Sequence, residues 1–210
     1  MLALFTLCCA YCRISKTCVE KQSLCFFSYS TQILRLPREM YPKNLEPNSF
    51  ETIRLFSGEE IQIPKATPCF EKWSCETLAD TYGNKTILNF NGEAVFAELA
   101  ILRIFQKEGW SGVWVDTYRR KYRTEYWNST TVIDLPSDKK MILDNIYKVA
   151  GSIKGCWDVF CWKEESIIFA ESKRLSKDKI RETQIRWLEA ALNYGLNKET
   201  SFLIVEWHLC

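Results

Sequence analysis

A regular alternation of helix-like and strand-like apolar patterns in the second half of the chain constrains the fold more than any other feature. A helical pattern begins at Asn91 or Gly92 and stops at Gly109. Further helices are predicted over residues 138–149 and 178–194, and strands over residues 111–117, 156–162, 166–173 and 201–207. Such alternation is typical of an α/β protein, in which helices flank a central mixed β-sheet.

Length and composition agree with one folded domain that carries a small appendage. The chain has 210 residues, of which 47% are hydrophobic and eight are tryptophan, enough to build a core and to exclude wholesale disorder. No run approaches the ~20 apolar residues that a helix needs to cross a bilayer. The net charge of +2 neither favours nor excludes a nucleic-acid partner, because a local basic surface matters more than the total.

The chain divides into three parts by composition. Residues 1–45 form an N-terminal cysteine-rich extension that we expect to be poorly ordered, because it lacks a helical or strand period. Residues 46–90 are expected to form a hairpin and an irregular segment packed on the core. Residues 91–210 form the expected core domain. A Pro-bounded segment surrounds Met40, which is a candidate native start.

Five of the ten cysteines lie in the first 39 residues. A zinc site there would need irregularly spaced thiols to converge, whereas tetrahedral sites normally use two tight ligand pairs, so zinc is not expected. Its ligands would be Cys9, Cys12, Cys18 and Cys25. Cys156 and Cys161 lie in an apolar run that is typical of packed core thiols. Because the chain also begins without a convincing secretory signal, we expect a reducing, cytoplasmic location.

Three charged residues on two neighbouring apolar segments are the strongest candidates for chemistry. Glu171 and Lys173 end an apolar run, and the two-residue period of a strand places them on the same face. Asp158 interrupts the preceding apolar run, so pairing of the two strands would bring Asp158 beside Glu171. Burying a lone charge is costly, which favours a functional site. The alternative is a structural ion pair at the strand ends.

Two convergent carboxylates without histidine or cysteine at matching spacing favour a hard cation held by oxygen ligands, Mg²⁺ or Mn²⁺. Such an ion lowers the pKa of bound water and polarises a phosphoryl oxygen. Lys173 would orient the attacking water or neutralise the charge that develops on the phosphate.

The spacing of these residues carries a family resemblance. The matching positions are Gly155-x-x-Asp158, Glu171-x-Lys173 after twelve intervening residues, and Gln184-x-x-Trp187 on the following helix. The chain resembles the PD-(D/E)XK nuclease superfamily, is most similar to its VRR-NUC branch, and is also similar to archaeal Holliday-junction resolvases. The proline that often precedes the aspartate is Trp157 here.

The resemblance covers residues 91–208 and implies a restriction-endonuclease-like core. It implies that Asp158, Glu171 and the backbone carbonyl of Ser172 bind the metal ion, and that Lys173 is the catalytic lysine. Members of the family also carry a glutamate on the first helix, which implies a role near the metal ion for Glu98.

Two of these roles have competing interpretations. Glu93 competes with Glu98 for the role near the metal ion, and Glu98 would otherwise lie at the margin of a mostly apolar helix. Gln184 lies on the apolar stripe of the last helix, where its amide needs a partner. It is expected either to contact the site, as a catalytic residue, or to cap a backbone group. Trp187 is expected in the core rather than as a platform for substrate.

A basic and aromatic segment follows the strand predicted over residues 111–117. Its cations, which are candidate substrate-binding residues, are Arg119, Arg120, Lys121 and Arg123. Cations that contact phosphates and tyrosines that stack on bases are typical of single-strand and distorted-duplex binding. The alternative is a solvated charged surface. The stretch of residues 173–186 is also basic, and some of its cations are expected to border the substrate.

These features together predict a divalent-metal-dependent nuclease that hydrolyses phosphodiester bonds in DNA rather than RNA, with a preference for particular DNA structures. An endonuclease of DNA repair fits this description. The alternatives are a non-catalytic nucleic-acid-binding module that retains the nuclease fold, and a protein-interaction domain with a structural charged trio. A homodimer remains open, because junction-cleaving relatives are commonly symmetric dimers.

Overall fold

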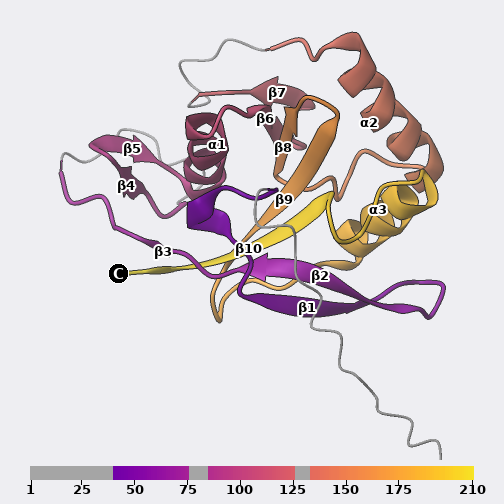
Figure 1. Cartoon of the computed structure of the whole chain (residues 1–210), viewed down its shortest axis with the longest axis horizontal. Helices are drawn as coiled ribbons and strands as arrows, with labels where there is room; N and C mark the ends of the chain where they lie inside the picture. Colours follow the sequence, from indigo (N-terminus) through magenta and orange to yellow (C-terminus); the bar gives the residue numbers. More distant parts are fainter. Residues whose placement is uncertain (1–39, 76–84, 126–132) are drawn as a thin grey trace, which may run out of the picture. The chain divides into compact units, whose positions relative to one another are not determined.

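The computed structural model describes residues 40–75, 85–125 and 133–210 (Figure 1). The expectations for residues 1–39, which include the disorder of the extension and the zinc alternative, lie outside these ranges.

Within the described residues, the chain forms three α-helices, one short 3₁₀-helix and ten β-strands. The helices are η1 Lys43–Leu45, α1 Ala97–Lys107, α2 Ser137–Ala150 and α3 Glu182–Asn193. The strands are β1 Ser49–Arg54, β2 Glu60–Ala66, β3 Cys69–Phe70, β4 Leu88–Phe90, β5 Glu93–Val95, β6 Ser111–Asp116, β7 Lys121–Arg123, β8 Val159–Lys163, β9 Ser166–Arg174 and β10 Phe202–Leu209. No helix in the described part is long and apolar enough to cross a membrane.

One large mixed sheet forms the centre of the described structure. Its strand order is β1-β2-β10-β9-β8-β6-β7, and β3 pairs with the far end of β10. Strand β10 runs parallel to β2, β3 and β9, whereas the pairs β1–β2, β8–β9, β6–β8 and β6–β7 are antiparallel. A mixed sheet of this kind confirms the predicted α/β class and the predicted hairpins, β1–β2 and β8–β9.

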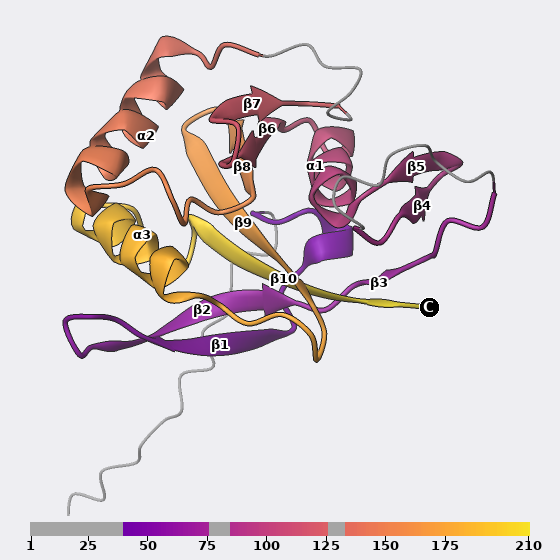
Figure 2. The ribbon, with the colours of Figure 1, turned by 180° about the vertical axis from the view of Figure 1, so that it is seen from behind.

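The helices cover the two faces of the sheet (Figures 1 and 2). Helix α1 packs in a core cluster that includes Ala170 and Val205 of the sheet. Helices α2 and α3 pack in the other cluster, which includes Phe169 and Phe202 from the same two strands. Successive side chains of a strand point to opposite faces, so α1 lies on one face and α2 and α3 lie on the other. The prediction of a central sheet flanked by helices is confirmed.

The first helix begins later than the sequence pattern predicts. Asn91 and Gly92 have positive φ angles of 53° and 87° and form the turn between β4 and β5. An Asn-Gly pair adopts this two-residue hairpin turn easily, because both positions require the left-handed region. The prediction of a helix start at Asn91 or Gly92 is therefore wrong. Glu93 belongs to a strand, and the helix starts at Ala97.

The last helix and the strand before the candidate site are also shorter than predicted. The Asp178 carboxylate accepts a hydrogen bond from the Arg174 backbone N–H at 3.0 Å, so it closes the turn after β9 instead of starting a helix. Helix α3 begins only at Glu182. Strand β8 begins at Val159, so Asp158 lies immediately before the strand and not inside it.

The N-terminal extension ends earlier in the chain than predicted. Tyr41 and Leu45 are buried, and the Tyr41 hydroxyl donates a hydrogen bond to the Glu199 carbonyl at 2.7 Å. The predicted extension of residues 1–45 therefore ends before Tyr41, because the segment from Tyr41 onwards packs in the core.

The described cysteines fall into two chemical states. Cys156 and Cys161 are free and buried, as expected for packed core thiols. Cys69 and Cys210 form a disulfide that ties strand β3 to the last residue of the chain. Disulfides persist mainly in oxidising surroundings. The reducing location therefore remains a prediction, and this bond does not support it.

Candidate active site

The candidate site lies at one end of three central strands of the sheet. At this end β8 begins, and β9 and β10 approach their C-terminal ends. The register of the β8–β9 hairpin places Val159 opposite Ala170. Asp158 therefore lies next to the Glu171–Ser172 peptide, and its Oδ2 accepts a hydrogen bond from the Ser172 backbone N–H at 3.1 Å. The structure thus brings Asp158 and Glu171 together, as the sequence pattern predicted.

Glu171 and Lys173 form a buried ion pair on one face of β9. Their side chains are 1% and 9% exposed, and Lys173 Nζ lies 2.6 Å from Glu171 Oε1. Gln184 of α3 binds both, since its Nε2 donates to Glu171 Oε1 and its Oε1 accepts from Lys173 Nζ at 3.2 Å. A single amide therefore fixes both charged side chains.

The amide of Gln184 also has a backbone partner. Its Oε1 accepts a hydrogen bond from the Arg181 backbone N–H at 2.9 Å, at the start of α3. Both interpretations of Gln184 are thus present in the structure, contact with the charged pair and capping of a backbone group. Trp187, one turn further along, is fully buried, as expected for a core residue.

Gly155 allows the chain segment that leads to Asp158 to pack directly against the backbone of α3. Gly155 has a φ of +87°, and a Cβ at this position would lie 2.0 Å from the Thr183 carbonyl oxygen. Any other residue would collide with backbone, which cannot move aside as a flexible side chain would. Gly155 therefore sets the distance between the segment carrying Asp158 and the helix carrying Gln184.

The two carboxyl groups are hard to ionise together. Burial raises the pKa of Asp158 from 3.8 to about 6, and the negative charge of Glu98 adds to the effect, whereas Lys85 and Lys173 oppose it. Burial also raises the pKa of Glu171 well above its usual value, and the charge of Asp158 raises it further. Neighbouring carboxylates in a low dielectric need a proton or a cation between them.

The residues of this site fit a hard divalent cation. Glu171 Oε2 is buried and has no hydrogen-bond partner among the described residues. A buried carboxylate oxygen without a partner is rare, and here it accompanies a second carboxylate and a shortage of positive charge. Asp158 and Glu171 would hold the ion. No group of three or more histidine, cysteine, aspartate or glutamate residues suited to a metal occurs in the described part, so further ligands would have to be backbone oxygens, water or substrate.

Of the two candidate glutamates near the first helix, Glu98 is the one close to the site. It lies in the first turn of α1, where the helix dipole favours negative charge, and its charge raises the pKa of Asp158. It also forms an ion pair with Lys85. Glu93 lies in β5 and pairs with Arg103 at 3.2 Å. This placement favours Glu98 over Glu93 for the expected role.

A cationic cleft of about 470 Å³ opens on the α1 side of β9, where Ser172 lines it but Asp158, Glu171 and Lys173 do not. Its basic lining residues are Lys85, Arg174, Lys177 and Arg181. Glu98 and Asp178 are its acidic lining residues, and Ser172 lies at its base. Four cations against two acids leave the cleft positive, which suits a phosphate chain. Arg174, Lys177 and Arg181 belong to the basic stretch of residues 173–186, whose contact with substrate remains a prediction.

The basic segment after β6 is only partly available to a ligand. Arg123 is buried and its Nε lies 3.2 Å from Asp116 Oδ2, so its prediction as a surface contact for substrate is wrong. Arg119 also approaches Asp116 Oδ2, at 3.6 Å. Arg120 and Lys121 are exposed at the sheet edge that carries Asp158. These two cations remain predicted substrate contacts.

Sequence reasoning missed two residues of the site, Lys85 and Trp207. Lys85 lies outside any periodic segment, and only the fold brings it to Glu98. Trp207 reads as a core residue of the last strand, but its Nε1 donates to Ser172 Oγ at 3.1 Å and the Arg174 guanidinium lies over its ring. Neither contact has a local signal in the sequence, because both partners are distant along the chain.

Comparison with known proteins gives no relative: no family model, no curated protein and no solved structure matches this chain. The resemblance to PD-(D/E)XK nucleases therefore remains a prediction, and the functional argument rests on the site itself.

Proposed function

We propose that this protein is a divalent-metal-dependent nuclease that hydrolyses phosphodiester bonds, with DNA as the preferred substrate. One observation carries the proposal: the half-buried carboxyl of Asp158 and the buried carboxyl of Glu171 lie side by side, buried Lys173 pairs with Glu171, and Ser172, whose N–H binds Asp158, lines a cationic cleft. Two carboxylates that share a single buried cation can bind a metal ion. The positively charged cleft can bind the phosphates of the same substrate. Mg²⁺ or Mn²⁺ is the expected ion.

Each residue of the candidate site has a separate role in this proposal. Asp158 and Glu171 would hold the metal ion, which would supply a Lewis acid and lower the pKa of a bound water molecule. Lys173 carries its charge next to Glu171 and stabilises the negative charge that develops on the phosphate. Gln184 holds Lys173 and Glu171 in one geometry, which reduces the reorganisation needed during reaction. Lys177 would bind a neighbouring phosphate.

The alternative of a non-catalytic nucleic-acid-binding module has one observation in its favour. Glu171 Oε1 already binds Lys173 and Gln184, and the described residues hold no cluster of three metal-binding side chains. A purely structural ion pair, however, would not need the half-buried Asp158 beside it. Metal-dependent cleavage distinguishes the two functions, because both bind nucleic acid in a salt-dependent manner.

The test is an incubation of the full chain with single-stranded, duplex, flap and four-way-junction DNA, and with matched RNA, in Mg²⁺, Mn²⁺ or EDTA. We expect cleavage of DNA with either metal and none in EDTA. Asp158→Ala, Glu171→Gln and Lys173→Met should each reduce the rate by at least a hundredfold while binding persists. Arg103→Met, which removes a cation of α1 that pairs with Glu93 outside the site, is the control and should cleave normally. Salt-dependent binding without cleavage in any metal would favour the binding module.

A further inference from the structure

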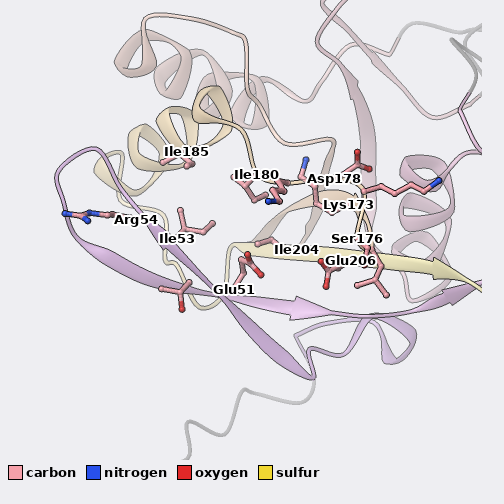
Figure 3. Close-up of a pocket in the computed structure, with 14 residues that line it drawn as sticks. Glu51, Ile53, Arg54, Lys173, Ser176, Asp178, Ile180, Ile185, Ile204 and Glu206 are labelled. Carbon is pink, nitrogen blue, oxygen red and sulfur yellow. The ribbon is translucent and has the colours of Figure 1, made fainter.

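A second cavity, of about 570 Å³, lies on the opposite face of β9 from the cationic cleft (Figure 3). Lys173 and Leu175 line this cavity, whereas Ser172 and Arg174 line the cleft, as the alternation of a strand requires. Its other walls are strand β1, strand β10, the segment that leads into α3, and the first turn of α3. We call it the isoleucine pocket, after the lining residues Ile53, Ile180, Ile185 and Ile204.

The chemistry of the isoleucine pocket differs from that of the cleft. Five aliphatic side chains, the four isoleucines and Leu175, form its apolar surface, and no aromatic side chain lines it. The cations at its rim are Arg54, Lys177 and Lys179, and none of the three has an ion-pair partner among the described residues. Of its three lining acids, Glu51 and Glu206 both bind Lys65, at 2.8 and 3.4 Å, and Asp178 accepts a hydrogen bond from the Arg174 backbone N–H. The pocket therefore offers apolar contact inside and positive charge outside.

Continuity with the candidate site decides which ligand fits. Lys173 lines the pocket and also binds Glu171, and the cleft shares Lys177 and Asp178 with the pocket. A ligand in the pocket would thus be separated from Glu171 only by the side chain of Lys173. A ligand spanning both spaces needs an apolar, flat part joined to an anionic part, and a nucleotide has this composition.

We propose that the isoleucine pocket binds one unpaired nucleobase of the strand whose phosphate occupies the cationic cleft. The inference rests on the proposed nuclease function and names its substrate class. A base in a duplex is stacked and paired, so it cannot enter without being extruded, which costs a few kcal/mol. Single strands, flaps and junctions with unpaired nucleotides are therefore preferred over continuous duplex.

The experiment is a walk of one abasic nucleotide along a single-stranded DNA, with cleavage mapped at nucleotide resolution in Mg²⁺. Removal of the base at one fixed position beside the cut should lower kcat/KM about tenfold, since a base–side-chain contact contributes ~1–3 kcal/mol. Other positions should change it less than threefold. Binding in EDTA of the same strands, with 2-aminopurine at that position, reports entry of the base independently of cleavage.

Variants that fill the pocket test its location. Ile180→Trp, at a half-buried wall position, should lower kcat/KM on the intact strand about tenfold and abolish the penalty for the abasic nucleotide. Thr52→Trp, at an exposed lining position of β1, provides the same test if the first variant fails to fold. Val149→Trp, on the exposed surface of α2, is the matched control and should behave as the parent.

The outcomes separate this inference from the proposed function. Metal-dependent cleavage with no position-specific abasic effect would overturn the pocket assignment and leave the nuclease intact. An abasic effect that persists in Ile180→Trp and Thr52→Trp would place the base elsewhere and would also overturn it. A change of oligomeric state in the pocket variants, with unchanged nucleotide sensitivity, would assign the pocket to contact between copies of the chain. Absence of any cleavage in Mg²⁺ or Mn²⁺ would instead contradict the proposed function.

Discussion

Replacing Asp158 by asparagine should stabilise the metal-free protein, although it should abolish activity. The pKa of Asp158 rises from 3.8 to about 6 in the fold, which at about 1.4 kcal/mol per pKa unit corresponds to about 3 kcal/mol at most. Asp158 keeps partial contact with solvent, so screening lowers the expected gain to about 1–3 kcal/mol. Asparagine cannot ionise, yet its side-chain oxygen can still accept the hydrogen bond from the Ser172 N–H.

The sign follows from the raised pKa. Between pH 3.8 and about 6 the folded protein holds a proton on Asp158 that the unfolded chain has already released, so stability falls as pH rises. The contribution is fully present below pH 3.8 and is lost as pH passes through about 6. Asp158→Asn removes this loss, and its advantage should therefore be about half as large at pH 5 as near pH 8, where it is largest.

The assay is urea unfolding of the parent and the variant in EDTA at pH 5 and pH 8, with Asp116→Asn as a matched control. Asp116 is also buried, but it pairs with buried Arg123 at 3.2 Å. Asp116→Asn removes the negative charge that pairs with buried Arg123 and should cost about 3–5 kcal/mol at pH 8. The two Asp→Asn changes thus have opposite signs. A destabilised Asp158→Asn protein at pH 8, or a gain equal at both pH values, would refute the reasoning.

Three further predictions test other parts of the site. Gly155→Ala should lower the free energy of unfolding by about 2–4 kcal/mol and impair cleavage, whereas Gly151→Ala, left-handed but in open space, should cost only about 1 kcal/mol in the same denaturant titration. Glu98→Gln should raise the Mg²⁺ concentration for half-maximal cleavage several-fold, and Glu93→Gln should leave it unchanged. Arg120→Glu should leave the melting temperature unchanged and reduce the slope of log affinity against log salt by about one; an unchanged slope would return this residue to a solvated role.

Local signals explain the part of the site that could be predicted. Asp158 and Glu171 are separated by a hairpin whose two strands are apolar and whose turn is short, so pairing follows from the pattern alone. The shared face of Glu171 and Lys173 follows from the two-residue period of β9. The spacing of Gln184 within a strongly periodic helix placed it on the correct side of α3, although the start of that helix was misjudged.

The remainder depends on tertiary contacts that the local sequence pattern does not specify. The parallel pairing of β2 with β10 joins residues far apart in sequence. No connecting turn is present whose residues would predict this pairing. The Asn91-Gly92 pair is compatible with both a helix start and a hairpin turn. The turn forms because β4 pairs with β5. Arg123 belongs to a basic run that reads as surface, and only the fold places Asp116 beside it in the interior.

Two buried charge groups at the same edge of the sheet show why one is structural and the other is a candidate for chemistry. Asp116 lies within ion-pair distance of both Arg123 and Arg119, so its charge is already matched by neighbouring cations. Asp158 and Glu171 face one another with Lys173 as their nearest buried cation, and Glu98 is itself balanced by Lys85. This second group needs one further positive charge when both carboxyls are ionised. A proton supplies it in acid and a divalent cation can supply it near neutral pH, so the imbalance that weakens the metal-free fold is also the free energy available to bind the metal.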